Sequence, residues 1–284
     1  MSNTNSKPRI VIYGCGQYGS HIARFAVQKG WPIVAAFNRA GAKVGQDLGR
    51  VIGLGRDLGV IVQDCDTGDY AVLDGKADIG IVAQFNMLRR NYLAYEGLLS
   101  VGVNVGCHGT ESYYPFGIDP ETSAKIDELA KKNGVSFMGG GIWDMSRIWS
   151  GILLCGPCTE IKSLHHNSLT CIEGQCDQAQ ARQVGTGMTV EEFYQAGLDK
   201  AAYLGCYKTI PEQVLVALGY TIAETSVKLE PVTFRVPKAN GDAPGTDFAA
   251  GIVLGTRVIG DIHTKEGVTG HATIELRAGL PGEQ

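Results

Sequence analysis

The chain has 284 residues, of which 44% are hydrophobic and 19% are charged. This length predicts two domains with packed cores, and the composition excludes a disordered chain or a coiled coil. The formal net charge is −4, and neither a lysine-arginine block nor an apolar run of the ~18 residues that a membrane span needs is present, so neither nucleic acid nor a membrane is expected as a partner.

The first half of the sequence alternates short apolar runs with helical patterns. Strands are expected where apolar and β-branched residues cluster between turn signals, and helices where apolar residues recur every three to four positions. Strands separated by helices predict parallel βαβ units with right-handed crossovers, which is a doubly wound Rossmann domain. The expected strands are 9–13, 32–37, 60–62, 78–83, 103–106 and 135–138, and the expected helices are 18–29, 86–100 and 119–133.

The pattern changes after the three glycines at 139–141. Long alternating segments follow without helices between them, which predicts a second α+β domain built on a mostly antiparallel sheet. We expect residues 1–139 to bind a dinucleotide, and residues 140–284 to bind substrate and to support a homodimer. The expected strands are 160–172, 221–236 and 248–276, and the expected helices are 143–154, 190–204 and 212–218.

A glycine-rich motif, GCGQYG, lies between the first expected strand and the first expected helix. In this context GxGxxG is typical of a dinucleotide-binding turn. Gly14 allows the tight turn, Gly16 lets a pyrophosphate meet the backbone, and Gly19 lets helix and strand pack closely. Gln17 and Tyr18 open the helix, whose unpaired N–H groups attract anions. The five residues are therefore candidate cofactor ligands.

The second strand ends at Asn38-Arg39, where NAD-binding proteins usually carry an acidic residue for the ribose hydroxyls. No Asp or Glu is present there, and Arg39 with Lys43 could neutralise a 2′-phosphate. This pattern favours NADP, with NAD as the alternative, and adds Asn38, Arg39 and Lys43 to the candidate ligands. A solvated surface role for Arg39 remains open.

Two later strands end in polar or reactive residues. Ala83 and Gln84 follow one of them, and Cys107 and His108 follow the next. Ligands of doubly wound sheets bind outside the carboxyl ends of the strands, so these four residues are expected to line the nicotinamide side.

Glu111 follows in the run CHGTESYYPF. Apolar and aromatic neighbours raise the pKa of a carboxyl group and suit it to acid–base chemistry near neutrality. The alternative is an ordinary loop carboxylate that caps the helix starting near Asp119. Spacing alone does not decide between these two roles.

The segments GCGQYGSHIARF, FNRAGAKVGQDLGRVIGLG and CHGTESYYPF together resemble the 2,4-diaminopentanoate dehydrogenase-like family, which includes the native amine dehydrogenases. The resemblance covers residues 9–141 well and 184–193 loosely. It implies the fold of dihydrodipicolinate reductase, and NAD(P)H-dependent interconversion of a ketone or aldehyde plus ammonia with an amine. It also implies that Glu111 is the catalytic residue.

Three departures from the family pattern limit what the resemblance implies. The segment GGGIWDM at 139–145 differs from the family's usual sequence, which leaves substrate size open. Members are usually longer at the carboxyl end, so we expect a C-terminally truncated chain. The second domain matches too loosely to transfer pocket residues, and its candidate substrate ligands are Trp143, His166 and Asn167.

Two rival functions remain. The pair His165-His166 is similar to the paired histidines of dihydrodipicolinate reductase, an imine reductase, but Leu169 stands at the position of that enzyme's lysine. In an alternating strand the two histidines point to opposite faces. The other rival is a non-enzymatic NADP-binding redox sensor.

The eight cysteines, without a signal peptide, predict reduced thiols in a cytoplasmic protein. Cys155 and Cys158 form a CxxC pair, but it is expected at the carboxyl end of a helix, where the dipole does not lower a thiol pKa. The later pair, Cys171 and Cys176, has the wrong spacing for a four-cysteine zinc site. We therefore expect no metal.

Overall fold

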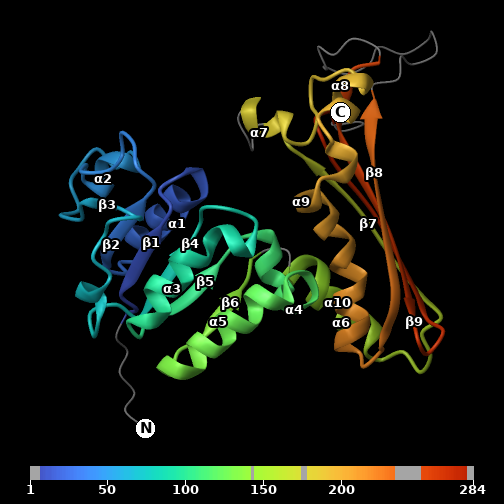
Figure 1. The fold of residues 1–284 in the computed structure, drawn as a ribbon, viewed down its shortest axis with the longest axis horizontal. Helices are drawn as coiled ribbons and strands as arrows, with labels where there is room; N and C mark the ends of the chain where they lie inside the picture. The colour runs from blue at the N-terminus through green and yellow to red at the C-terminus, as the bar shows by residue number, and fades with distance from the viewer. Residues whose placement is uncertain (1–6, 142–143, 174–177, 234–250, 280–284) are drawn as a thin grey trace. The chain divides into compact units, whose positions relative to one another are not determined.

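The computed structural model describes residues 7–141, 144–173, 178–233 and 251–279 (Figure 1). The chain divides into two compact units, Met1–Gly141 and Ile142–Gln284, which are described separately. The expected fold class, a Rossmann domain followed by an α+β domain, is confirmed. The functions expected of the two parts stay predictions. None of the helices in the described ranges has the length and apolar character needed to cross a bilayer.

The first unit is built on a parallel six-stranded sheet of order β3-β2-β1-β4-β5-β6. The order reverses between β1 and β4, which is the switch point where ligands of doubly wound sheets bind. Its strands are β1 (Ile10–Tyr13), β2 (Ile33–Asn38), β3 (Val62–Asp64), β4 (Ile79–Val82), β5 (Asn104–Cys107) and β6 (Phe137–Gly139).

Two apolar cores lie on opposite faces of this sheet. Because side chains alternate along a strand, Ile10 and Ile12 of β1 pack on α1, while Val11 and Tyr13 pack on the face covered by α3 and α5. The helices are α1 (Gln17–Gln28), α2 (Leu48–Val51), α3 (Tyr92–Ser100), α4 (Pro115–Ile118) and α5 (Pro120–Asn133).

Helix α5 begins and ends at the expected residues. The Asp119 side chain accepts a hydrogen bond from the Thr122 N–H, and Gly134 at the carboxyl end adopts φ +65°. The helix expected over 86–100 is instead divided into a 3₁₀ turn, Leu88–Asn91, and α3.

The second unit contains a four-stranded sheet of order β7-β10-β9-β8. Its strands are β7 (Ser163–Cys171), β8 (Ile222–Thr233), β9 (Val253–Thr264) and β10 (Thr269–Arg277). β8, β9 and β10 pair antiparallel, whereas β7 pairs parallel with β10. The single expected strand 248–276 is therefore wrong, because it folds as the hairpin β9-β10.

Helices cover one face of the second sheet. They are the π-helix Asp144–Trp149, α6 (Ser150–Cys155), α7 (Gln178–Arg182), α8 (Val190–Gln195), α9 (Ala202–Gly205) and α10 (Thr209–Ala217). The helix expected over 190–204 is interrupted at Gly197, which adopts φ +68° and starts a separate 3₁₀ turn. Apolar residues of α10 such as Ile210 and Val214 pack on Val258 and Ile274 of the sheet.

The KVGQDLG stretch folds as a loop held by one carboxylate. Asp47 is buried and accepts hydrogen bonds from the N–H groups of Gly49, Leu58 and Gly59 at 2.7–2.8 Å. The hydrogen bond from Leu58 is the largest contribution that lowers the pKa of Asp47. Gly49 lies so close to the Arg56 carbonyl that an added Cβ would be 2.1 Å from its oxygen. Both residues are therefore fixed by backbone contacts.

Replacing Gly49 tests this loop. Gly49→Ala should destabilise the protein by about 1–3 kcal/mol, because the new methyl group must displace a backbone carbonyl. Urea unfolding measures the change. Gly205→Ala is the matched control, since its Cβ meets nothing nearer than 3.8 Å. Equal stability of the two variants would show that the loop can shift at no cost.

Candidate functional site

The glycine-rich turn joins β1 to α1 at the switch point of the first sheet. Gly14 adopts φ +97°, and a Cβ at this position would lie 2.7 Å from the Ala83 carbonyl oxygen. A Cβ on Gly19 would lie 1.7 Å from the Gly14 oxygen. The turn therefore packs on the end of β4 and on its own helix without room for side chains.

Gly16 is the exception, because an added Cβ would meet nothing within 4 Å. It is the N-cap of α1, has extended backbone, and no side chain caps the helix there. Gln17 and Tyr18 begin the helix, and Tyr18 is exposed. An open backbone turn at an uncapped helix N-terminus fits the pyrophosphate of a dinucleotide.

Two residues predicted as cofactor ligands also hydrogen-bond at the turn. The Asn38 side chain accepts a hydrogen bond from the Cys15 N–H at 3.0 Å and donates to the Arg39 carbonyl at 3.0 Å. The Lys43 ammonium donates to the Cys15 carbonyl at 2.5 Å. These bonds fix the glycine-rich turn to the end of β2.

A cationic cluster at the end of β2 includes one residue that the sequence analysis missed. The guanidinium of Arg39 lies 5.1 Å from the centroid of the Phe85 ring, and that of Arg90 lies 3.9 Å from the same centroid. Both arginines are exposed, and neither has an ion pair among the described residues. Arg90 follows Arg89 in a dibasic pair, which was the available signal, but spacing does not show that it reaches Phe85.

The ends of β4 and β5 lie beside the turn. Ala83 is buried, and the Gln84 amide contacts the Cys65 sulfur at 3.8 Å. The Cys107 sulfur accepts the Gly109 N–H at 3.3 Å and lies 3.1 Å from the Tyr95 hydroxyl. Burial raises the pKa of Cys107. Its thiol therefore anchors the following loop rather than acting as a nucleophile.

Glu111 lies on the 3₁₀ turn Thr110–Tyr113, directly after β5. Its side chain is buried, with 8% exposure, and Oε2 accepts a hydrogen bond from the Leu88 N–H at 2.8 Å. Burial raises the pKa of Glu111, and the Leu88 N–H opposes this effect. The environment expected for an acid–base carboxyl group is present.

The alternative role for Glu111, a cap on the helix near Asp119, is wrong. Asp119 itself caps α5, accepting hydrogen bonds from both the N–H and the hydroxyl of Thr122. Burial would raise the pKa of Asp119, but Thr122 and the ion pair with Arg89 outweigh it. Glu111 instead binds the first N–H of the 3₁₀ turn at Leu88.

The glycines after β6 make room for the turn that carries Glu111. A Cβ on Gly139 would lie 1.7 Å from the Ser112 carbonyl oxygen, and one on Gly141 would lie 2.6 Å from the Tyr113 hydroxyl. The Gly140 N–H donates to the Cys107 carbonyl at 3.0 Å. The sequence predicted only a change of pattern here, whereas the structure assigns the glycines a packing role.

The structure describes two of the three substrate residues expected in the second unit. His166 is half-buried and faces the helices, while Asn167 is exposed on the opposite face of β7, so one ligand cannot contact both from the same face. Burial and the nearby Arg147 lower the pKa of His166 to about 4. Trp143 lies outside the described residues. His165 and His166 face opposite sides, as expected.

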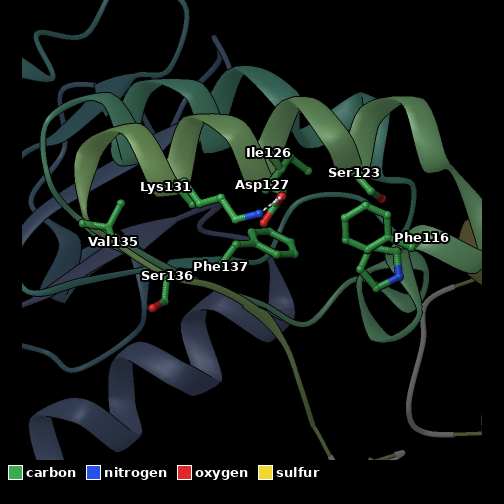
Figure 2. Close-up of a pocket in the computed structure, with 10 residues that line it drawn as sticks. Phe116, Ser123, Ile126, Asp127, Lys131, Val135, Ser136 and Phe137 are labelled. Atoms are coloured by element: carbon green, nitrogen blue, oxygen red, sulfur yellow. Dashed lines mark hydrogen bonds and ion pairs between the residues drawn. The ribbon is translucent and has the colours of Figure 1, made fainter. Parts of the chain in front are cut away.

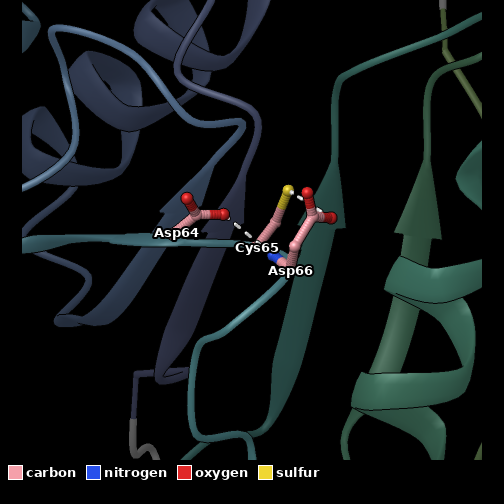
Figure 3. Close-up of side chains that lie close together, drawn as sticks. All are labelled: Asp64, Cys65 and Asp66. Carbon is pink, nitrogen blue, oxygen red and sulfur yellow. Dashed lines mark hydrogen bonds between the residues drawn. The ribbon is translucent and has the colours of Figure 1, made fainter.

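The cysteine pair Cys155 and Cys158 lies at the carboxyl end of α6, as expected. A different group, Asp64, Cys65 and Asp66, has ligand atoms within 4.8 Å of one another (Figure 3). Burial raises the pKa of Cys65, which disfavours the thiolate that binds metals. The Asp64 carboxylate accepts the Asp66 N–H at 2.9 Å, and the thiol lies 3.7 Å from the Asp66 carboxylate. Local hydrogen bonds explain this group.

A pocket of about 290 Å³ lies between α5 and β6, with Phe116, Ile126 and Phe137 in its lining (Figure 2). The Asp127–Lys131 ion pair, 2.7 Å long, borders it. Neither the glycine-rich turn nor Glu111 contributes to the lining, so this pocket is separate from the residues discussed above.

Comparisons with known proteins agree with this arrangement. No family model matches the chain. An amine dehydrogenase structure from Mycobacterium smegmatis is 30% identical with a TM-score of 0.83, and the match covers 98% of this chain and 81% of that one. The curated 2,4-diaminopentanoate dehydrogenase of Acetoanaerobium sticklandii is 25% identical over 82% of this chain, which spans only 66% of that relative.

A more distant structure shows the fold alone. GenD2 from gentamicin A biosynthesis, solved in complex with NAD, is 15% identical with a TM-score of 0.56, over 98% of this chain and 67% of that one. The resemblance found in the glycine-rich turn and the Glu111 loop thus extends over nearly the whole chain at 30% identity. The chain belongs to the amine dehydrogenase family of nicotinamide-dependent oxidoreductases.

Proposed function

We propose that this protein reductively aminates a small ketone or aldehyde with ammonia, using NADPH, and catalyses the reverse deamination of the amine. The observation that carries the proposal is the buried Glu111 carboxyl group with a raised pKa, on the loop that leaves β5 beside the switch point. The names of the two relatives support amines as the substrate class.

Glu111 supplies proton transfer. As a carboxylate it attracts ammonium and takes a proton from it, and as an acid it protonates the departing hydroxyl of the carbinolamine. In deamination the same group takes the proton from the amine and helps water to add. Because Oε2 is held by Leu88, Oε1 is the oxygen available to exchange protons. The nicotinamide, when bound, supplies or accepts the hydride.

The proposal favours NADP over NAD because of Arg39 and Arg90. Arg39 directly follows β2, where the adenosine ribose of a dinucleotide binds in this fold. Its guanidinium group and that of Arg90 both contact the Phe85 ring. A contact with a ring leaves the N–H groups of these arginines available to bind a phosphate. Lys43 supplies a third positive charge nearby, although it also supports the turn. A homodimer and a cytoplasmic location stay predictions.

Replacing the carboxyl group tests the catalytic role. Glu111→Gln keeps an acceptor for the Leu88 N–H but cannot transfer a proton, so kcat for amine oxidation should fall about 10²–10⁴-fold. NADPH consumption or formation at 340 nm measures turnover, and fluorescence titration should show unchanged NADPH binding. Full activity in this variant would contradict the assignment.

The pH dependence gives a second test. Since burial raises the pKa of Glu111 above its usual 4.5, the carboxylate needed for deamination is lost on acidification at a pH above that value. We expect kcat/KM for the amine to fall through this raised pKa and the acidic limb to be absent from the residual activity of Glu111→Gln. A wild-type limb at or below pH 4.5 would contradict the proposed environment.

Cofactor preference is tested at the two arginines. Arg39→Ala and Arg90→Ala should each weaken NADPH binding about 10-fold or more, because each removes a charge-assisted hydrogen bond to the 2′-phosphate. NADH binding should change less than about 2-fold. Arg56→Ala, an exposed arginine of the same unit, is the control. Equal losses for both cofactors would remove the NADP assignment.

A further inference from the structure

His108 is a partly buried group that the proposed mechanism leaves unused. It directly follows β5, and its Nε2 atom is buried without a hydrogen-bond partner in the described part of the chain. Buried polar side chains in native proteins are nearly always paired, and leaving one unpaired costs about 1–3 kcal/mol. An unpaired nitrogen at the carboxyl end of a central strand therefore indicates a ligand contact.

The chemistry of this nitrogen follows from its surroundings. Burial lowers the pKa of His108, so the ring is neutral at physiological pH, and a hydrogen bond with its own backbone acts in the opposite direction. Because Nε2 has no partner, Nδ1 is the nitrogen that donates to the backbone carbonyl. In a neutral ring with Nδ1–H, Nε2 is a hydrogen-bond acceptor. The missing partner must therefore offer an N–H or O–H group.

Contacts to both the ring and the backbone position His108. Tyr18, in the first turn of α1, contacts it edge-on with ring centroids 4.8 Å apart. The Tyr113 hydroxyl donates to the His108 carbonyl at 3.3 Å, and the His108 N–H donates to the Val82 carbonyl at 3.4 Å. The imidazole thus lies between the pyrophosphate-binding turn and the loop of Glu111.

We propose that His108 Nε2 accepts a hydrogen bond from the nicotinamide nucleoside of the bound cofactor, through either the carboxamide N–H or a ribose hydroxyl. This inference rests on the proposed function. The adenosine half is assigned to the end of β2, so the ends of β4 and β5 receive the other half of the dinucleotide. His108 then orients the reactive ring beside Glu111.

The test compares two cofactors and one substitution. His108→Phe keeps an aromatic ring against Tyr18 and removes the nitrogen. Dissociation constants are measured by fluorescence titration for NADPH and for its reduced 3-acetylpyridine analogue, which lacks the carboxamide N–H. His21→Phe, an exposed histidine of α1, is the matched control. We expect His108→Phe to bind NADPH about 10-fold more weakly than wild type.

The analogue identifies the donor. If the carboxamide donates, wild type binds the analogue weakly and His108→Phe adds no further loss. If a ribose hydroxyl donates, His108→Phe weakens both ligands equally. Unchanged NADPH binding in His108→Phe would overturn the inference.

One further measurement, together with the Glu111→Gln variant, separates the proposed function from this contact. Nitrogen-15 NMR of wild type should show the His108 Nε2 resonance shifting on NADPH addition, and a resonance that does not move would also overturn the inference. If wild type bound no pyridine nucleotide at all, the proposed function would fail. If His108→Phe bound normally while Glu111→Gln lost activity, only the His108 contact would be wrong.

Discussion

The structure of the site depends on one close approach, between the backbone of Gly139 and the carbonyl of Ser112. Any side chain at position 139 would overlap that oxygen, so the turn after β5 can rest on β6 only because residue 139 is glycine. The Ser112 hydroxyl, 3.0 Å from the Cys107 carbonyl, closes the same turn from within. Together these contacts determine that Glu111 points into the protein rather than into solvent.

The polar residues around the glycine-rich turn and Phe85 divide into supports and candidate ligands. Asn38 and Lys43 use their polar groups on the glycine-rich turn, which fixes the backbone where the pyrophosphate is proposed to bind. Within the described ranges, Arg39 and Arg90 contact the Phe85 ring and form no ion pair, so their N–H groups remain available. The proposed 2′-phosphate site needs both a rigid backbone and available cations, and different residues provide them.

The sequence pattern correctly predicted the elements that are determined by residues close together in the chain. The strand–turn–helix at GCGQYG, the Asp119 cap and the Gly134 terminus follow from residues within one or two turns of each other. Contacts between distant segments could not be predicted from residue spacing. These include the hydrogen bond between Leu88 and Glu111, the contact of Arg90 with Phe85, and the parallel pairing of β7 with β10. The glycines after β6 were noticed, but their reason lies 27 residues earlier, at Ser112.

The hydrogen bond from Leu88 gives Glu111 a structural role, which is compatible with the proton transfer proposed for it. A hydrogen bond to the charged form lowers the pKa of a carboxyl group, whereas removal from water raises it. Burial is the larger effect for Glu111. The N–H contact therefore opposes the rise in the pKa, while burial keeps the proton affinity of Glu111 above that of a surface glutamate. Fixing Oε2 also limits rotation of the side chain, so that in the proposed mechanism proton exchange occurs at Oε1. A carboxyl group balanced in this way can change its protonation state during each turnover without leaving its position.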